Sequence, residues 1–224
     1  MSNLSPRLLA AASEIGVVDS LADIGTDHGK LIVYALERGL AKRAFAVDIS
    51  PKSLDKARRN IQERSFSKVV EFYCGDGLKP LADVSDVVVI AGIGGNETVK
   101  ILTEGKQQKK LVLIPHQDAQ IVRKFLVENG YRLEKDYYVE DGKYYAVLVA
   151  TYGKEAISYT EEEYWLGKNV PETEAFYKRH EKRLEDIERI MREQQVDADV
   201  LQPDIRKEYE VLKTWSKSQT LFRK

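Results

Sequence analysis

The chain has 224 residues, of which 43% are hydrophobic and 32% are charged, and this composition is typical of a globular protein with a core of its own. The formal net charge of −1 excludes a general attraction to nucleic acid, so a surface that binds RNA would have to be a local patch. No apolar run approaches the roughly 20 residues of a membrane-spanning helix, so we expect no membrane contact.

Most of the chain alternates between apolar strand-like runs and helical segments. Ser5 and Pro6 begin a helix, as a cap followed by proline, and apolar residues then recur at helical spacing up to Ile15. Strands are predicted at Leu21–Ile24, Ala44–Val47, Val69–Tyr73, Val87–Ile90 and Leu111–Ile114. Helices are predicted at Lys30–Arg38, Pro51–Arg64, Thr98–Leu102 and Ala119–Glu128. Continuous apolar strands that alternate with helices indicate a parallel sheet covered on both faces.

Beyond Gly130 the pattern becomes that of a hairpin. Tyr131–Glu140 and Lys143–Thr151 are strand-like and are joined by Asp141-Gly142, a strong hairpin turn signal. Parallel strand–helix units that end in an antiparallel hairpin are typical of the Rossmann-like class I methyltransferase fold. We therefore predict an α/β fold with a mostly parallel seven-stranded sheet whose last strand is antiparallel. A dehydrogenase domain normally lacks this hairpin.

The C-terminal part is charged and amphipathic. Apolar residues recur along 172–195, and a second stripe follows Pro203 through Trp215. These patterns predict a helical hairpin at 156–224 after a cofactor-binding domain at 1–155. The hairpin is either a structural appendage or an arm that binds a partner or guides substrate. His180 lies among charged residues, and we expect it to be exposed.

The loop after the first strand reads Asp23-Ile24-Gly25-Thr26-Asp27-His28-Gly29. In a doubly wound sheet the ligand binds at the carboxyl ends of the strands, and Asp48 stands at the end of the second strand, where an acid accepts hydrogen bonds from ribose. Both NAD and S-adenosylmethionine carry that ribose. Asp27 favours the second ligand, because a carboxylate about 4 Å from a phosphate costs on the order of 4 kcal/mol at an effective dielectric near 20. S-adenosylmethionine has no phosphate and carries a sulfonium cation.

Two further loops follow strand ends. Asp76-Gly77 follows the third strand, where an acid could bind the amine of adenine with Leu78 against the ring, or where the pair could be a simple turn. Residues 91–95 read Ala-Gly-Ile-Gly-Gly after the fourth strand. So many glycines would let a flat base approach closely.

The order of these motifs, DIGTDHG, VDIS, GDGL and AGIGG followed by a hairpin and a helical arm, resembles the bacterial tRNA (adenine-22-N1)-methyltransferases. The resemblance covers essentially the whole chain. It implies methyl transfer from S-adenosylmethionine to N1 of an adenine in tRNA. The expected cofactor-binding residues are Asp23, Gly25, Asp27, Gly29, Asp48, Ile49, Asp76, Gly77, Leu78, Ala91, Gly92 and Gly94. The expected catalytic residues are Asp27, His28 and Arg7, and the expected substrate-binding residues are Arg7, His28, Ile93, Gly95, Pro115 and His116.

The sequence departs from the family pattern at two places. Ile114 stands where the family usually has glutamine and His116 follows Pro115, while Asn96 replaces a basic residue after Gly95. Two other functions therefore stay open: a methyltransferase of the same fold for a small molecule or protein, and a module that binds S-adenosylmethionine and tRNA without activity. The oligomeric state is open.

Short sequence features indicate candidate phosphate contacts and the cellular compartment. Lys42-Arg43, Arg58-Arg59 and Lys109-Lys110 are basic pairs that either contact phosphates or lie on solvated faces. The N-terminal segment lacks the regions of a secretion signal, and Cys74 as the single cysteine fits a reducing compartment, so we expect a cytoplasmic protein. Three scattered histidines give no metal-ligand spacing, so we expect no metal.

Overall fold

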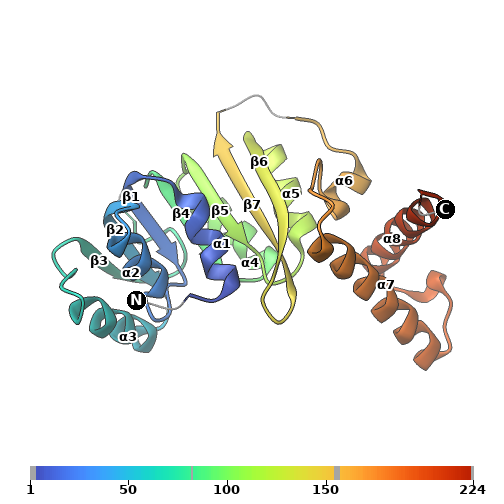
Figure 1. The fold of residues 1–224 in the computed structure, drawn as a ribbon, viewed down its shortest axis with the longest axis horizontal. Coiled ribbons are helices and arrows are strands. Elements are labelled where there is room, and N and C mark those ends of the chain that lie inside the picture. Colours follow the sequence, from blue (N-terminus) through green and yellow to red (C-terminus); the bar gives the residue numbers. More distant parts are fainter. Residues whose placement is uncertain (1–3, 82, 154–156, 223–224) are drawn as a thin grey trace.

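The computed structural model describes residues 4–81, 83–153 and 157–222, which form a seven-stranded sheet with helices on both faces and a helical arm at one end (Figure 1). The strands are β1 (Val18–Ile24), β2 (Ala41–Asp48), β3 (Val70–Cys74), β4 (Val87–Ala91), β5 (Lys110–Ile114), β6 (Tyr131–Glu140) and β7 (Tyr144–Tyr152). The helices are α1 (Pro6–Ile15), α2 (Lys30–Glu37), α3 (Pro51–Gln62), α4 (Gly95–Glu104), α5 (Ala119–Glu128), α6 (Glu161–Leu166), α7 (Glu174–Gln194) and α8 (Pro203–Phe222), with a 3-10 turn at Ala198–Val200. No described helix is long and apolar enough to cross a membrane.

The sheet has the predicted topology. Its strand order is β3-β2-β1-β4-β5-β7-β6. The pairs among β1 to β5 are parallel, and β7 runs antiparallel to both of its neighbours. The chain crosses to the other half of the sheet after β3, so the strand order reverses between the neighbouring strands β1 and β4, and a ligand crevice is expected at their carboxyl ends. The predicted methyltransferase fold is confirmed.

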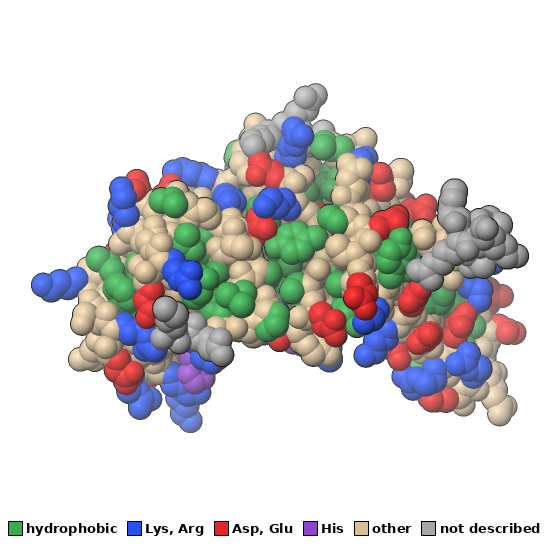
Figure 2. Space-filling model, in the orientation of Figure 1, with side chains coloured by type: hydrophobic (Ala, Val, Ile, Leu, Met, Phe, Trp, Pro, Cys, Tyr) green, Lys and Arg blue, Asp and Glu red, His purple; other side chains and the backbone are tan. Residues whose placement is uncertain are grey.

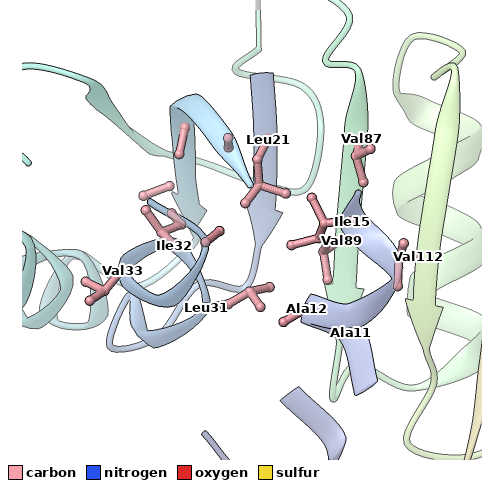
Figure 3. Close-up of a cluster of buried hydrophobic side chains, with 14 of the residues drawn as sticks. Ala11, Ala12, Ile15, Leu21, Leu31, Ile32, Val33, Val87, Val89 and Val112 are labelled. Carbon is pink, nitrogen blue, oxygen red and sulfur yellow. The ribbon is translucent and has the colours of Figure 1, made fainter. Parts of the chain in front are cut away.

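Each face of the sheet is covered by its own helices. Side chains from α1, α2 and α3 pack with one face, and side chains from α4 and α5 pack with the other. Figure 3 shows part of the first cluster, in which Ile15 of α1 is buried together with Leu21, Val89 and Val112 of three strands. Burial of one such aliphatic side chain stabilises the fold by roughly 1.5–3 kcal/mol.

Helix α1 is capped at its start and is bonded to the sheet at its end. The hydroxyl of Ser5 accepts a hydrogen bond from the backbone N–H of Leu8, as the predicted cap requires. At the other end, Nζ of Lys110 donates to the carbonyl of Glu14 at 2.6 Å, and the hydroxyl of Tyr137 bonds the Glu14 carboxylate at 3.1 Å. A cation at a helix C-terminus also complements the helix dipole. The end of α1 is therefore held near the amino end of β5, the sheet edge opposite the crevice.

The helical arm is confirmed as a hairpin of α7 and α8. Leu184 and Ile187 of α7 pack with Leu212 of α8, and Arg183 bonds both carboxylate oxygens of Glu208. The short helix α6 was not predicted, although its capping box is readable in the sequence. Residues 155 and 156, between which the predicted domain boundary falls, lie outside the described residues.

The prediction for His180 is wrong. Its side chain is buried at the base of the arm, where Nδ1 lies 2.7 Å from the carbonyl of Phe176 and the ring contacts those of Phe176, Tyr138 and Trp215. Burial lowers the pKa of His180 to about 3, so the imidazole is neutral. His180 follows Phe176 by one helical turn and precedes Leu184 by another, so it belongs to the apolar stripe.

Candidate cofactor and substrate crevice

The carboxyl ends of β1, β2, β3 and β4 surround a pocket of about 140 Å³, here called the crevice pocket. It is lined by Ile24, Gly25, Val47, Asp48, Ile49, Gly75, Asp76, Gly77, Ile93, Glu97 and Ile101. The structure thus brings together residues from all four predicted loops. Glu97 and Ile101 were missed, because they belong to α4 and the sequence does not reveal which face of that helix meets the crevice.

The first loop is fastened to the end of β2. Backbone N–H groups of Gly25 and Thr26 donate to the carbonyl of Val47 at 2.8 and 3.1 Å. The N–H of Asp27 donates to Oδ2 of Asp48 at 3.1 Å, while Oδ1 of Asp48 accepts from the N–H of Ser50. These bonds hold the Asp48 carboxylate at the pocket wall.

Three carboxylates gather at this loop. Asp23 is buried and accepts a 2.7 Å hydrogen bond from the hydroxyl of Thr26. The pKa of Asp23 is raised to about 6, chiefly by burial, while the bond from Thr26 opposes the shift and the negative charges of Asp48 and Asp27 add to it. The pocket edge therefore concentrates negative charge, which favours a cationic ligand and disfavours a phosphate.

Two residues of the third loop have surroundings that the sequence did not reveal. Asp76 lines the pocket, but its carboxylate pairs with Lys79 at 3.2 Å and with Lys100 at 3.7 Å. The hydrogen bond from Lys79 lowers the pKa of Asp76. Leu78 is buried in the core beneath the loop and does not line the crevice pocket, so its contact with the adenine ring stays a prediction.

Gly29 was expected to let α2 pack near its strand, and this is corrected. A Cβ on Gly29 would lie 3.2 Å from Cβ of Ala57 and 3.1 Å from Cδ1 of Ile61, both in α3. The glycine thus allows two helices to approach each other. The sequence therefore indicates correctly that close packing requires glycine at this position, but the packing partner is α3 and not the strand.

The fourth and fifth loops form one connected platform. The N–H of His116 donates to the carbonyl of Ile93, and the N–H of Gly95 donates to that of Gln117. A Cβ on Gly95 would lie 2.4 Å from the carbonyl oxygen of Asp118, so only glycine fits there. Gly95 is accordingly buried, Gly94 is the N-cap of α4, and Ala91 is half-buried at the end of β4.

The family departure at Ile114 does not face the crevice. Its side chain is fully buried in the core on the α1 side of the sheet, and the adjacent Pro115 is also buried. His116 is exposed, and its ring lies edge-on to Tyr145 with 5.4 Å between the centroids. Of these three fifth-loop residues, only His116 is exposed, and none of the three lines the crevice pocket.

The three predicted catalytic residues come from two elements. Nε2 of His28 lies 3.5 Å from Oδ2 of Asp27, and both side chains are well exposed. Arg7 extends from the first turn of α1 across the fourth loop, where a Cβ on Gly92 would lie 3.3 Å from Nη1. Gly92 has a φ of +84°, a conformation that favours glycine. Arg7 therefore lies against Gly92, and the next residue in the chain, Ile93, lines the crevice pocket.

Most of the candidate phosphate contacts serve the fold. Lys42 pairs with Asp19 at 2.7 Å, Lys109 pairs with Asp86 at 2.8 Å, and Arg43 and Arg58 lie over aromatic rings. The pairs that begin at Lys42 and Lys109 also lie at the amino ends of β2 and β5, the edge opposite the crevice. Arg59 on α3 remains exposed, with its Nε bonded to a backbone carbonyl of its own helix. Among the described residues, no cluster of three or more His, Cys, Asp and Glu side chains could hold a metal ion.

Comparison with known proteins agrees with this geometry. The family model of the methyltransferase domain matches residues 4–148. The crystal structure of the Bacillus subtilis m1A22 tRNA methyltransferase TrmK is similar, with a TM-score of 0.79 and 27% identity over 97% of each chain. A Streptococcus pneumoniae protein described as a putative tRNA (m1A22) methyltransferase, in complex with S-adenosyl-L-methionine, has a TM-score of 0.82 and 23% identity, with 95% of this chain and 99% of that chain covered.

A curated relative gives the family. The tRNA (adenine(22)-N(1))-methyltransferase of Bacillus subtilis strain 168 is 33% identical over 162 residues, which cover 70% of this chain and 68% of the relative. The matched methyltransferase domain contains the crevice pocket, and the sheet topology is that of this enzyme class. The chain therefore belongs to the tRNA (adenine(22)-N(1))-methyltransferase family.

Proposed function

We propose that this chain transfers a methyl group from S-adenosylmethionine to N1 of an adenine in tRNA, at position 22. The observation that carries the proposal is the 33% identity with the Bacillus subtilis enzyme of that name, over 162 residues. An enzyme that acts on tRNA would work in the cytoplasm.

The charge of the crevice pocket fits this methyl donor. Asp48, held by two backbone N–H groups, is placed to accept hydrogen bonds from ribose hydroxyls, and exposed Ile49 beside it offers an apolar surface for adenine. Asp23 and Asp27 add negative charge beside the pocket, which would favour the sulfonium and amino groups of the donor. When bound, S-adenosylmethionine supplies an electrophilic methyl group. A dinucleotide would bring its pyrophosphate against the same carboxylates.

The target atom needs little acid–base chemistry. Adenine N1 has a lone pair and attacks without losing a proton, so the main demands are alignment and exclusion of water. N1 is hidden by pairing and stacking in an RNA helix, so the base must turn outward into the crevice. The methylated ring is cationic until a proton leaves N6, and the Asp27 and His28 pair would stabilise that charge or accept that proton.

The RNA backbone would lie along α3. This helix begins at the crevice edge, and Lys52, Lys56 and Arg59 are exposed on successive turns. Neither Lys52 nor Lys56 forms an ion pair with another described residue. Figure 2 shows Lys and Arg side chains gathered at the lower left, over the end of the molecule that carries α2 and α3. Free cations beside the crevice are available to phosphates.

The proposal is tested by labelled methyl transfer to undermethylated tRNA. Asp48→Ala and Asp27→Ala should each reduce transfer by at least about 100-fold, because a charged acceptor of donor hydrogen bonds is lost. Asp19→Ala is the matched control: Asp19 is an exposed acid at the amino end of β1, and this variant should keep wild-type transfer. Wild-type activity in both crevice variants would refute the assigned pocket.

Two outcomes would point to the other functions. Methyl transfer that survives ribonuclease treatment of the substrate would indicate a small-molecule or protein substrate. Binding of S-adenosylmethionine and tRNA by calorimetry, without release of S-adenosylhomocysteine, would indicate a binding module. Mass spectrometry of tRNA nucleosides from cells with and without the gene should show loss of 1-methyladenosine, and mapping of the modified fragment should place it at position 22.

A further inference from the structure

Tyr145 of β7 links two elements that face the crevice. Its ring lies beneath the guanidinium of Arg7, with 4.9 Å from Cζ to the ring centroid, and edge-on to His116 at 5.4 Å. Alternation along β7 turns Tyr145 and Val147 toward α1, whereas Ala146 and Leu148 face the opposite layer. The ring is therefore fixed by the sheet while the two residues it contacts come from α1 and from the loop after β5.

Arg7 has an unfilled hydrogen-bonding position at this place. Its Nε is out of solvent and has no hydrogen-bond partner among the described residues. The carboxylate of Asp141, in the turn between β6 and β7, lies 4.0 Å from Nε, which is too long for a hydrogen bond. A buried donor without an acceptor is costly, so an incoming acceptor group would be favoured here.

We infer that Tyr145 is a positioning residue, which holds Arg7 and His116 at fixed places beside the target base. The inference rests on the proposed function and deepens it, because it names the wall of the crevice that receives the base. Arg7 already lies against the fourth loop at Gly92, so displacement of its guanidinium would open the contact between α1 and that loop. Tyr145 itself is buried and is not expected to touch the base.

Both contacts are made by the ring of Tyr145 and not by its hydroxyl, so variants that keep or remove the ring test the inference. Tyr145→Phe keeps the ring and should stay within about threefold of wild type. Tyr145→Met keeps an apolar side chain without a ring face and should raise the KM for tRNA about tenfold, because the guanidinium loses its cation–π contact. The Kd for S-adenosylmethionine should remain within about twofold in both variants, since Tyr145 does not line the crevice pocket.

The control separates positioning from general packing. Tyr131 is equally buried and lies edge-on to Tyr152 at 5.4 Å, at the end of the sheet away from the crevice. Tyr131→Met should lower the Tm without changing the KM for tRNA. In an Arg7→Ala/His116→Ala background, Tyr145→Met should add less than about twofold, because its effect passes through these two residues.

If Tyr145→Met does not fold, a double-mutant cycle of Arg7 and His116, with Tyr145 unchanged, tests the positioning role. Arg7→Ala and His116→Ala should be non-additive by at least about threefold in kcat/KM, because both contact one ring. Strict additivity, or a Tyr145→Phe variant as defective as Tyr145→Met, would overturn the inference. These results leave the proposed function standing, whereas a wild-type protein that transfers no methyl group to tRNA would refute the proposed function itself.

Discussion

Asp23 shows how one buried carboxyl makes the crevice sensitive to pH. Its pKa in the folded chain is raised from 3.8 to about 6, chiefly by burial. The folded chain therefore holds this proton more tightly than the unfolded chain does. The stability that Asp23 contributes is fully present below pH 3.8 and is lost as the pH rises through about 6. Above that pH the folded chain carries a buried negative charge.

A bound cation would relieve that charge. We expect S-adenosylmethionine to bind more weakly as the pH falls from 7.5 to 5, by up to about tenfold per pH unit below the Asp23 pKa, because binding then has to release a proton. Calorimetry in buffers of different ionisation enthalpy measures this proton release. Asp23→Asn should bind more weakly at pH 7.5 and lose most of the pH dependence. An unchanged pH profile in Asp23→Asn would assign the dependence to another group.

We expect the exposed lysines of helix α3 to supply part of the electrostatic attraction to the RNA backbone. The double variant Lys52→Gln/Lys56→Gln should weaken tRNA binding and reduce the slope of log K against log salt by about 1.5, because two phosphate contacts are removed. The matched control is Lys42→Gln/Lys68→Gln, whose exposed lysines lie at the opposite edge of the sheet. Filter binding between 50 and 300 mM salt measures both slopes. Equal slopes in the two double variants would exclude α3 from the RNA interface.

The sequence predicts the elements better than their ends. All five parallel strands and the hairpin were located by apolar runs and turn signals. The predicted starts of β1 and β2 are too late, because Asp19 and Lys42 interrupt the apolar pattern at an edge where charged side chains reach solvent. Those two residues pair with each other across the adjacent strands, a contact that no local pattern reveals.

The site was predicted in its location more than in its details. Positions of Asp27, Asp48 and His28 follow from loops at the carboxyl ends of strands, which the topology brings to one edge. The environment of a side chain depends on elements that are distant in sequence. Leu78 is buried in the core. Tyr145 contacts Arg7 because the register of β7 brings its ring beneath α1.

Across the whole molecule, one buried ion pair between α5 and β6 also bonds the end of α6, the short helix that precedes the arm. Arg123 of α5 bonds both oxygens of Asp136 of β6, at 2.7 and 2.9 Å, with both side chains buried. The same guanidinium donates to the carbonyls of Tyr164 and Trp165 at the end of α6. The short helix α6 thus shares polar contacts with the methyltransferase domain, and the base of the arm shares its core.

Loss of this cation should be severe. Arg123→Ala leaves the Asp136 carboxylate buried without a partner, so we expect about 3–5 kcal/mol of destabilisation. Chemical denaturation followed by tryptophan fluorescence measures it, because Trp165 and Trp215 lie at the base of the arm. The double variant Arg123→Met/Asp136→Leu should recover most of the loss, since it removes both charges. If the single variant were as stable as wild type, the ion pair would have no role in stabilising the fold.

The position of β7 between β5 and β6 has a consequence for synthesis on the ribosome. Residues 4–114 contain all five parallel strands, yet one edge of β5 receives its partner only when residues up to 152 have left the exit tunnel. Until then the nascent chain presents an apolar strand, Leu111–Ile114, with open hydrogen-bonding groups, the kind of edge that recruits other chains. Truncations that end shortly after α5 should therefore aggregate. The hairpin of β6 and β7 covers the open edge of β5 and so completes the sheet that forms the crevice.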